Sequence, residues 1–217
     1  NAGYKNKVII KDINFSVHRG EIFVIIGRSG CGKTTLLKHM IGLYSPISGD
    51  ILINSISISH SSGEEKKKIM RSFGVLYQSG ALFNSYTIGE NVALPLEEFT
   101  DFSSAKIAAI VKEKLRLVGL EGAENLMPHQ SSGGMKKRAG LARAMALDPE
   151  ILFFDEPSAG LDPVTAAKLD RLIIDLRERL RTTMVIVSHE LDSIYAIADR
   201  VMMLDPDKKT TIAIGSP

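Results

Sequence analysis

The fold is decided by the stretch Gly27-Arg28-Ser29-Gly30-Cys31-Gly32-Lys33-Thr34-Thr35. An apolar run, residues 22–26, leads into it, and residues 36–41 follow with the character of a helix. Strand, glycine-rich turn and helix are the context in which the pattern G-x-x-x-x-G-K-[ST] predicts a phosphate-binding loop. The glycines let the backbone curl so that N–H groups face phosphate oxygens, and the positive end of the helix adds to that field. The sequence therefore predicts a nucleoside triphosphate site.

Three side chains of this loop have predicted properties. Lys33 is expected to reach the β- and γ-phosphates, and the Thr34 hydroxyl is expected to hold Mg²⁺. Cys31 is the only cysteine of the chain, so no internal disulfide can form, which agrees with a reducing compartment. We expect a thiol reagent to inactivate the protein through Cys31 and bound nucleotide to protect it.

Length and composition fit one large α/β domain, or a compact core that carries one insertion. Of the 217 residues, 44% are hydrophobic and 24% charged, which is ordinary for a soluble globular protein. The net charge of +2 gives no reason to expect a nucleic-acid partner. The basic run 66–68 follows Glu64 and Glu65, so pairing along a solvated helix explains it.

Neither a membrane span nor a signal peptide is expected from the sequence. No apolar run approaches the roughly 18–20 residues that cross a bilayer. The first residue, Asn1, is not methionine, and the chain ends at Pro217 without an obvious terminal element. Because residues can be missing at both ends, the lack of a targeting segment is weak evidence.

Hydrophobic periodicity divides the chain into a strand-rich and a helical part. Alternating, β-branched residues predict one or two strands over 7–18, and 49–54 is predicted to close an antiparallel patch with them. A helix over 64–71 and a buried strand over 73–77 follow. From about 79 to 148 the pattern is mostly helical, and it is clearest over 103–118. Strands and helices then alternate over 150–155, 163–181, 183–187, 191–198 and 200–204.

Such alternation is typical of a parallel sheet with right-handed crossovers. The predicted fold class is therefore α/β with a parallel sheet, and together with the phosphate loop it resembles the P-loop NTPase core of the RecA-like type. It carries an N-terminal antiparallel β patch and an α-helical insertion. We expect one domain, 1–217, in which 1–78 and 149–217 form the ATPase core and 79–148 the helical subdomain.

Two adjacent acids end a buried strand. Residues 151–154, Ile-Leu-Phe-Phe, are apolar, and Asp155 and Glu156 follow directly. Open α/β sheets bind ligands at the carboxyl ends of their strands. Asp155 is expected to complete the Mg²⁺ shell, and Glu156 to activate a water against the γ-phosphorus as general base.

The order of these motifs resembles the ATPases of ABC transporters. Ser132-Gly133-Gly134-Met135 followed by Lys136-Lys137-Arg138 looks like the signature motif of that family, although Ser131 stands where a leucine is usual. The resemblance implies that Ser132, Gly133 and Gly134 bind ATP held by the other subunit of a homodimer. These residues open a predicted helix running through Ala146, whose N-terminus suits phosphate.

The same resemblance assigns roles to four further residues. Gln78 matches a glutamine near Mg²⁺ and the attacking water, and His189 a switch histidine that contacts the γ-phosphate. Asp162, in a segment that resembles the D-loop, would cross the dimer interface. Tyr4 lies where the family places an aromatic that stacks on adenine, although packing of Tyr4 on the sheet is almost as well supported.

A narrower resemblance concerns the transported substrate. The segments 78–83, 127–128 and 133–138 are similar to the ATPase subunits of MCE-associated lipid transporters of the Mla, or toluene-tolerance, type. It implies an ATP- and Mg²⁺-dependent ATPase at the cytoplasmic face of the inner membrane, held there peripherally by a permease, with MCE-domain proteins beyond. Residues 80–83 would lie beside the groove for the permease, or else be plain core of the insertion.

Two alternatives stay open. The chain could be a soluble ABC-type ATPase of DNA repair or translation, although such proteins usually carry two nucleotide domains or a long insertion. It could also be an ABC ATPase that energises transport of another substrate.

Overall fold

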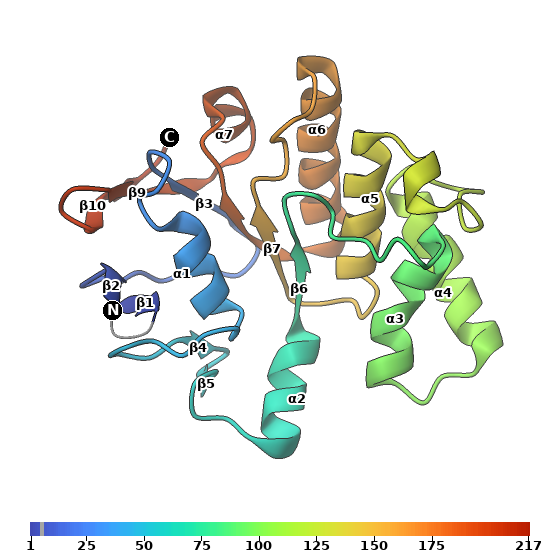
Figure 1. Cartoon of the computed structure of the whole chain (residues 1–217), viewed down its shortest axis with the longest axis horizontal. Helices are drawn as coiled ribbons and strands as arrows, with labels where there is room; N and C mark the ends of the chain where they lie inside the picture. The colour runs from blue at the N-terminus through green and yellow to red at the C-terminus, as the bar shows by residue number, and fades with distance from the viewer. Residues whose placement is uncertain (5–6) are drawn as a thin grey trace.

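The computed structural model describes residues 1–4 and 7–217, and a six-stranded sheet forms its centre (Figure 1). The strands lie in the order β10-β9-β3-β8-β7-β6. Five of them are parallel, and β10 runs antiparallel to β9. The predicted α/β class with a parallel sheet is therefore confirmed. The bounds are β3 (Ile22–Ile26), β6 (Phe73–Leu76), β7 (Ile151–Asp155), β8 (Thr183–Val187), β9 (Arg200–Asp205) and β10 (Thr210–Gly215).

Both faces of this sheet are buried, because its parallel strands are apolar along most of their length. Side chains alternate between the faces, so that Ile22 and Val24 of β3 join one buried cluster while Phe23 and Ile25 join the other. The first cluster continues into helices α3 to α7. The second lies against α1, α2 and the small antiparallel strands.

The helices begin and end close to the predicted positions. Ser103 caps α4 by accepting a hydrogen bond from the Lys106 N–H, and α2 has the expected Lys67–Glu64 pair at 3.0 Å. None of the described helices combines the length and the apolarity that crossing a membrane requires. Their bounds are α1 (Lys33–Met40), α2 (Gly63–Ser72), α3 (Ile88–Phe99), α4 (Ser104–Leu117), the 3₁₀ helix η1 (Pro128–Gln130), α5 (Gly133–Ala144), α6 (Pro163–Leu180) and α7 (Leu191–Ile197).

Helices α3, α4 and α5 pack together on the β6 side of the sheet (Figure 1, green to yellow). Their apolar faces belong to the same buried cluster as one face of the sheet. The division into an ATPase core and a helical subdomain over 79–148 thus stays a prediction.

The N-terminal strands differ from the predicted single patch. β1 (Ala2–Tyr4) pairs with β2 (Lys7–Ile10), and the rest of 7–18 lies outside the described strands. The predicted strand over 49–54 is reduced to β4 (Leu52–Ile53), which pairs with β5 (Ile56–Ser57) rather than with β1 or β2. Asn54 and Ser55 between them both have positive φ, 51° and 66°, as a tight type I′ hairpin turn requires. The local turn therefore decides the pairing.

Strand β10 was absent from the sequence prediction. It is built by a turn in which Asp205 Oδ1 accepts hydrogen bonds from the N–H groups of Asp207 and Lys208, both at 2.8 Å. The chain then reverses and pairs with β9. An aspartate that bonds the backbone two and three residues ahead is a recognised turn signal, so this hairpin could have been found.

Candidate functional site

The phosphate-loop residues form a tight turn between β3 and α1. Gly27 and Gly32 have φ angles of 156° and 103°, in the region that favours glycine. A Cβ on Gly27 would lie 2.5 Å from Cys31 Sγ, and one on Gly32 would lie 2.6 Å from Ile10 Cγ2. Both positions therefore need glycine for space as well as for conformation. Gly32 is the N-cap of α1, and Lys33 is its first residue.

Lys33 is held at the mouth of this loop. Its side chain is only 7% exposed, and its Nζ donates to the Gly27 carbonyl at 2.8 Å and lies 3.7 Å from Glu156 Oε1. A buried ammonium between a carbonyl and a carboxylate is pre-placed to bind phosphate oxygens. Contact of Lys33 with the β- and γ-phosphates stays a prediction.

Strand register brings the predicted catalytic residues to one edge of the sheet. Val187 lies opposite both Ile25 and Asp155, and Leu76 lies opposite Phe154. The residues just past these strand ends are consequently neighbours: Gly27 after β3, Gln78 after β6, Glu156 after β7 and His189 after β8.

Glu156 has a fixed backbone and a paired carboxylate. Its φ is 50°, unusual for a residue with a side chain, and its N–H donates to the Val187 carbonyl at 2.9 Å. Its Oε2 lies 2.7 Å from His189 Nδ1. An ionised carboxylate only accepts, so His189 Nδ1–H is the donor in this contact. Glu156 is 9% exposed, whereas the His189 side chain is 56% exposed and can meet a ligand.

Asp155 and Thr34 supply oxygen atoms beside the loop. The Thr34 hydroxyl donates to Asp155 Oδ1 at 3.1 Å. Burial raises the pKa of the Asp155 carboxyl, and the Thr34 hydrogen bond and the charges of Lys38 and Lys33 partly offset that rise. A buried carboxylate with a single hydrogen bond is suited to a cation, and one or two protein oxygens plus phosphates are the usual Mg²⁺ shell. The exposed Gln78 follows the neighbouring strand and could add an amide oxygen.

The signature residues form an exposed helix N-terminus. Ser132 is the N-cap of α5, and its Oγ accepts from the Met135 N–H at 3.2 Å. Ser132 and Gly133 are exposed, while Ser131 is buried and donates to the Met127 carbonyl at 3.4 Å. At this position Ser131 bears on the packing of the segment rather than on the exposed groups at the start of α5. The structure does not bring α5 to the phosphate loop of the same chain, since β7, β6 and α6 lie between α1 and α5 in Figure 1.

Asp162 lies beside the signature residues and caps a helix. Its Oδ1 accepts from the N–H groups of Val164 at 3.1 Å and Thr165 at 3.0 Å, at the start of α6. Hydrogen bonds, chiefly from Thr165, hold the pKa of the Asp162 carboxyl below its usual value. A Cβ on Gly134 would lie 2.8 Å from Thr165 Cγ2, so the two segments are in contact.

Tyr4 lies against the start of α1. Its hydroxyl donates to Thr35 Oγ1 at 3.2 Å, and its ring meets the edge of Tyr44 at 4.9 Å between centroids. The half-buried Tyr4 side chain thus packs against Thr35 and Tyr44 of the protein itself. Stacking of Tyr4 on adenine stays a prediction.

Two residues of helix α5 contact the predicted site, although the sequence motifs do not predict this. Lys137 bonds to the turn after Glu156, and Arg143 bonds to the loop after Gln78. Lys137 belongs to the segment 136–138 that resembles the signature motif, but that resemblance gives it no contact with the Glu156 turn, and the sequence alone gives Arg143 no role. The sequence did contain a signal for these contacts. Both cations lie in a helix rich in alanine and glycine, which suits close packing, and a cation on a packed helix must be paired.

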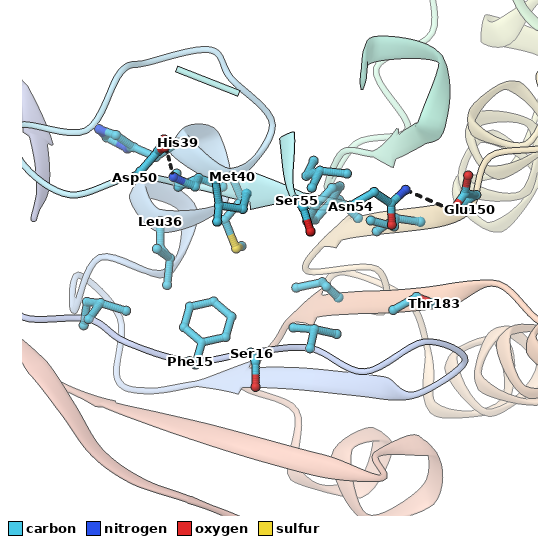
Figure 2. Close-up of a pocket in the computed structure, with 18 of the residues that line it drawn as sticks. Phe15, Ser16, Leu36, His39, Met40, Asp50, Asn54, Ser55, Glu150 and Thr183 are labelled. Carbon is cyan, nitrogen blue, oxygen red and sulfur yellow. Dashed lines mark hydrogen bonds between the residues drawn. The ribbon is translucent and has the colours of Figure 1, made fainter. Parts of the chain in front are cut away.

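A cavity of about 860 Å³ is lined by other parts of the chain (Figure 2). In Figure 2, Phe15 faces Leu36 and Met40 across it, and Asn54 Nδ2 donates to Glu150 Oε2 at 3.0 Å on its rim. None of the predicted nucleotide-binding or catalytic residues lines it. The candidate site is therefore the open edge of the sheet and not this cavity.

Comparison with known proteins identifies the family. The model of the family described as "ABC transporter" matches residues 10–159. The chain is 45% identical over 196 residues to the probable ribonucleotide transport ATP-binding protein mkl of Mycobacterium leprae, covering 90% of this chain and 56% of that protein. It is 43% identical over 211 residues to the intermembrane phospholipid transport system ATP-binding protein MlaF of Escherichia coli K12, covering 97% and 78%. The chain thus spans little more than half the length of the mycobacterial relative.

Solved structures support the same family assignment. A dimeric, post-hydrolysis ATP-binding cassette, MJ0796 bound to ADP and Pi, matches with a TM-score of 0.86 and 30% identity over 96% of this chain and 90% of that one. The protein cbiO1 from Clostridium perfringens, part of an ABC transporter complex, matches with a TM-score of 0.88 and 28% identity over 99% and 85%. The motifs, their placement and these matches agree: the chain belongs to the ABC transporter family, as its ATP-binding cassette.

Proposed function

We propose that this protein hydrolyses ATP to drive phospholipid transport, as a homodimer beneath a separate permease with MCE-domain partners. It would lie peripherally at the cytoplasmic face of the inner membrane. The observation that carries the proposal is the similarity to MlaF, which runs through 97% of this chain and 78% of the relative. Because the mycobacterial relative is named for ribonucleotide transport, a ribonucleotide is the competing substrate.

The residues at the carboxyl ends of the parallel strands would carry out ATP hydrolysis. The loop amides and Lys33 stabilise negative charge on the β- and γ-phosphates, where charge develops during phosphoryl transfer. Glu156 accepts a proton from the attacking water, and His189 holds the carboxylate from the exposed side. Thr34, Asp155 and Gln78 would hold Mg²⁺, which when bound neutralises charge between the phosphates.

An exposed aromatic pair supports docking of a membrane subunit. Phe83 and Tyr86 are 55% and 41% exposed, and their ring centroids lie 5.9 Å apart. Asn91 fixes this loop, since its Oδ1 accepts from the Phe83 N–H and its Nδ2 donates to the carbonyls of Phe83, Tyr86 and Thr87. A rigid loop with exposed aromatic rings has the character of a protein interface.

The experiment is purification of the full-length protein from detergent-solubilised membranes, followed by reconstitution in vesicles. We expect a polytopic permease and an MCE-domain protein to co-purify, and ATP to drive transfer of a fluorescent phospholipid. ATP-driven movement of a labelled ribonucleotide without phospholipid transfer would contradict the proposal that the substrate is a phospholipid. Co-purification with ribosomes or DNA would instead favour a soluble ABC ATPase.

A further inference from the structure

Lys137 lies in the interior of the protein with three backbone carbonyls around its ammonium group. It is the fifth residue of α5 and is 5% exposed. Its Nζ donates to the carbonyls of Glu156 at 3.4 Å, Pro157 at 2.5 Å and Ala159 at 2.6 Å. All three acceptors belong to the turn that carries the predicted general base.

This arrangement uses every hydrogen-bond donor of the lysine. An ammonium group has three N–H donors and no acceptor, so three carbonyls satisfy it completely. Burial lowers the pKa of Lys137, and the nearby Glu156 charge opposes that change. Without these three backbone carbonyls the buried charge of Lys137 would destabilise the folded protein, because a buried charge must be paired or hydrogen-bonded.

The turn itself needs a partner on its inner side. Glu156 has a positive φ of 50°, and the Ala159 N–H donates back to the Glu156 carbonyl at 3.2 Å. The chain reverses there, so the carbonyls of residues 156, 157 and 159 converge on one point. Lys137 fills that point and opposes the mutual repulsion of the carbonyl dipoles.

Helix α5 thereby touches two parts of the proposed mechanism. At its N-terminus Ser132 and Gly133 are exposed, and the next turn of the same helix holds the Glu156 turn through Lys137. We propose that Lys137 is a positioning residue that fixes the Glu156 turn to the signature helix. The end of α5 offered to the partner's ATP is then coupled to the catalytic carboxylate of its own subunit. This inference rests on the proposed roles of Glu156 and of the signature residues.

The test compares three substitutions at Lys137 in the full-length protein. Lys137→Met keeps the alkyl stem but no donor, Lys137→Gln keeps two donors, and Lys137→Arg keeps the charge and several donors. We expect kcat for ATP hydrolysis to fall by about 10- to 100-fold in Lys137→Met, since small misplacement of a catalytic group has effects of this size. Lys137→Gln should be intermediate, Lys137→Arg should recover part of the rate, and KM for ATP should stay within about twofold.

Lys114→Met is the matched control. Lys114, on α4, is also buried, at 3% exposed, but its Nζ donates to the carboxylate of Asp148, in the segment between α5 and β7. This substitution should lower the melting temperature while kcat stays within about twofold. If Lys137→Met does not fold, Lys137→Gln decides the matter with the same measurements.

Two results would overturn the inference. One is an unchanged kcat in Lys137→Gln and Lys137→Met. The other is a rise in KM for ATP equal to the fall in kcat/KM, which would place Lys137 in nucleotide binding instead. Failure of the underlying mechanism is separate: Glu156→Gln would then hydrolyse ATP at a near-normal rate.

Discussion

Hydrogen bonds hold the backbone and one carboxylate oxygen of Glu156 and leave its other carboxylate oxygen outside these bonds. Its N–H, its carbonyl and one carboxylate oxygen are bound to Val187, Lys137 and His189. The other oxygen, Oε1, faces Lys33 at 3.7 Å, where phosphate is expected. The carboxylate can therefore accept a proton without first reorganising.

Glu156→Gln keeps this shape and removes the base. The amide oxygen can still accept from His189, so ATP binding should persist while kcat falls by about 10²- to 10⁴-fold. An ATP-bound dimer should accumulate and be visible by size-exclusion chromatography with nucleotide. Hydrolysis near the wild-type rate would show that another group is the base.

At the scale of elements, helix α5 also holds the loop after Gln78. Arg143 donates to the carbonyls of Ala81 at 2.7 Å and Gly80 at 2.9 Å. A Cβ on Gly140 would lie 2.8 Å from the Gly80 carbonyl oxygen, so helix and loop are in direct backbone contact. The loop that carries the exposed Phe83 is thus anchored to the signature helix.

Arg143→Met should uncouple this loop from hydrolysis. We expect stability to fall by about 2 kcal/mol, the scale of charged hydrogen bonds, and less phospholipid to be transferred per ATP. Arg138→Met is the control, since Arg138 on the same helix donates to the carbonyls of Val118 and Gly119, away from the loop. Equal transfer per ATP in both variants would contradict the coupling.

Elements with local signals were predicted well, and those that depend on distant partners were not. The apolar run before Gly27 forms β3, and the helical pattern over 103–118 forms α4, Ser104–Leu117. The pairing of β4 depends on the turn at Asn54, and the role of Lys137 depends on carbonyls about twenty residues away in sequence. Periodicity contains no information on such contacts, so these were missed or misplaced.

In the whole molecule, the two predicted halves of the nucleotide site do not meet within one chain. The phosphate loop and Glu156 lie at the sheet edge, while Ser132 to Gly134 lie on α5 beyond α6. A symmetric dimer would place each half opposite the other. Activity should then depend on two chains.

Mixing two inactive variants tests this arrangement. Lys33→Ala damages the loop and Ser132→Arg damages the signature, so either homodimer has two defective sites. A mixed dimer has one intact site, and refolding an equal mixture should restore about a quarter of wild-type ATPase activity by random pairing. A mixture as inactive as its components would mean that both halves act within one chain.

The side chain of Cys31 is buried inside the phosphate loop: it is 2% exposed, and its Sγ lies against Gly27. A reagent can reach its thiol only while the loop is open, so the labelling rate measures how often the empty loop opens. Bound nucleotide should slow labelling, and the ratio of the two rates should give the free energy by which the nucleotide keeps the loop closed. Equal rates with and without nucleotide would contradict this. The one cysteine of the chain is thus a natural probe of loop opening that needs no engineered label.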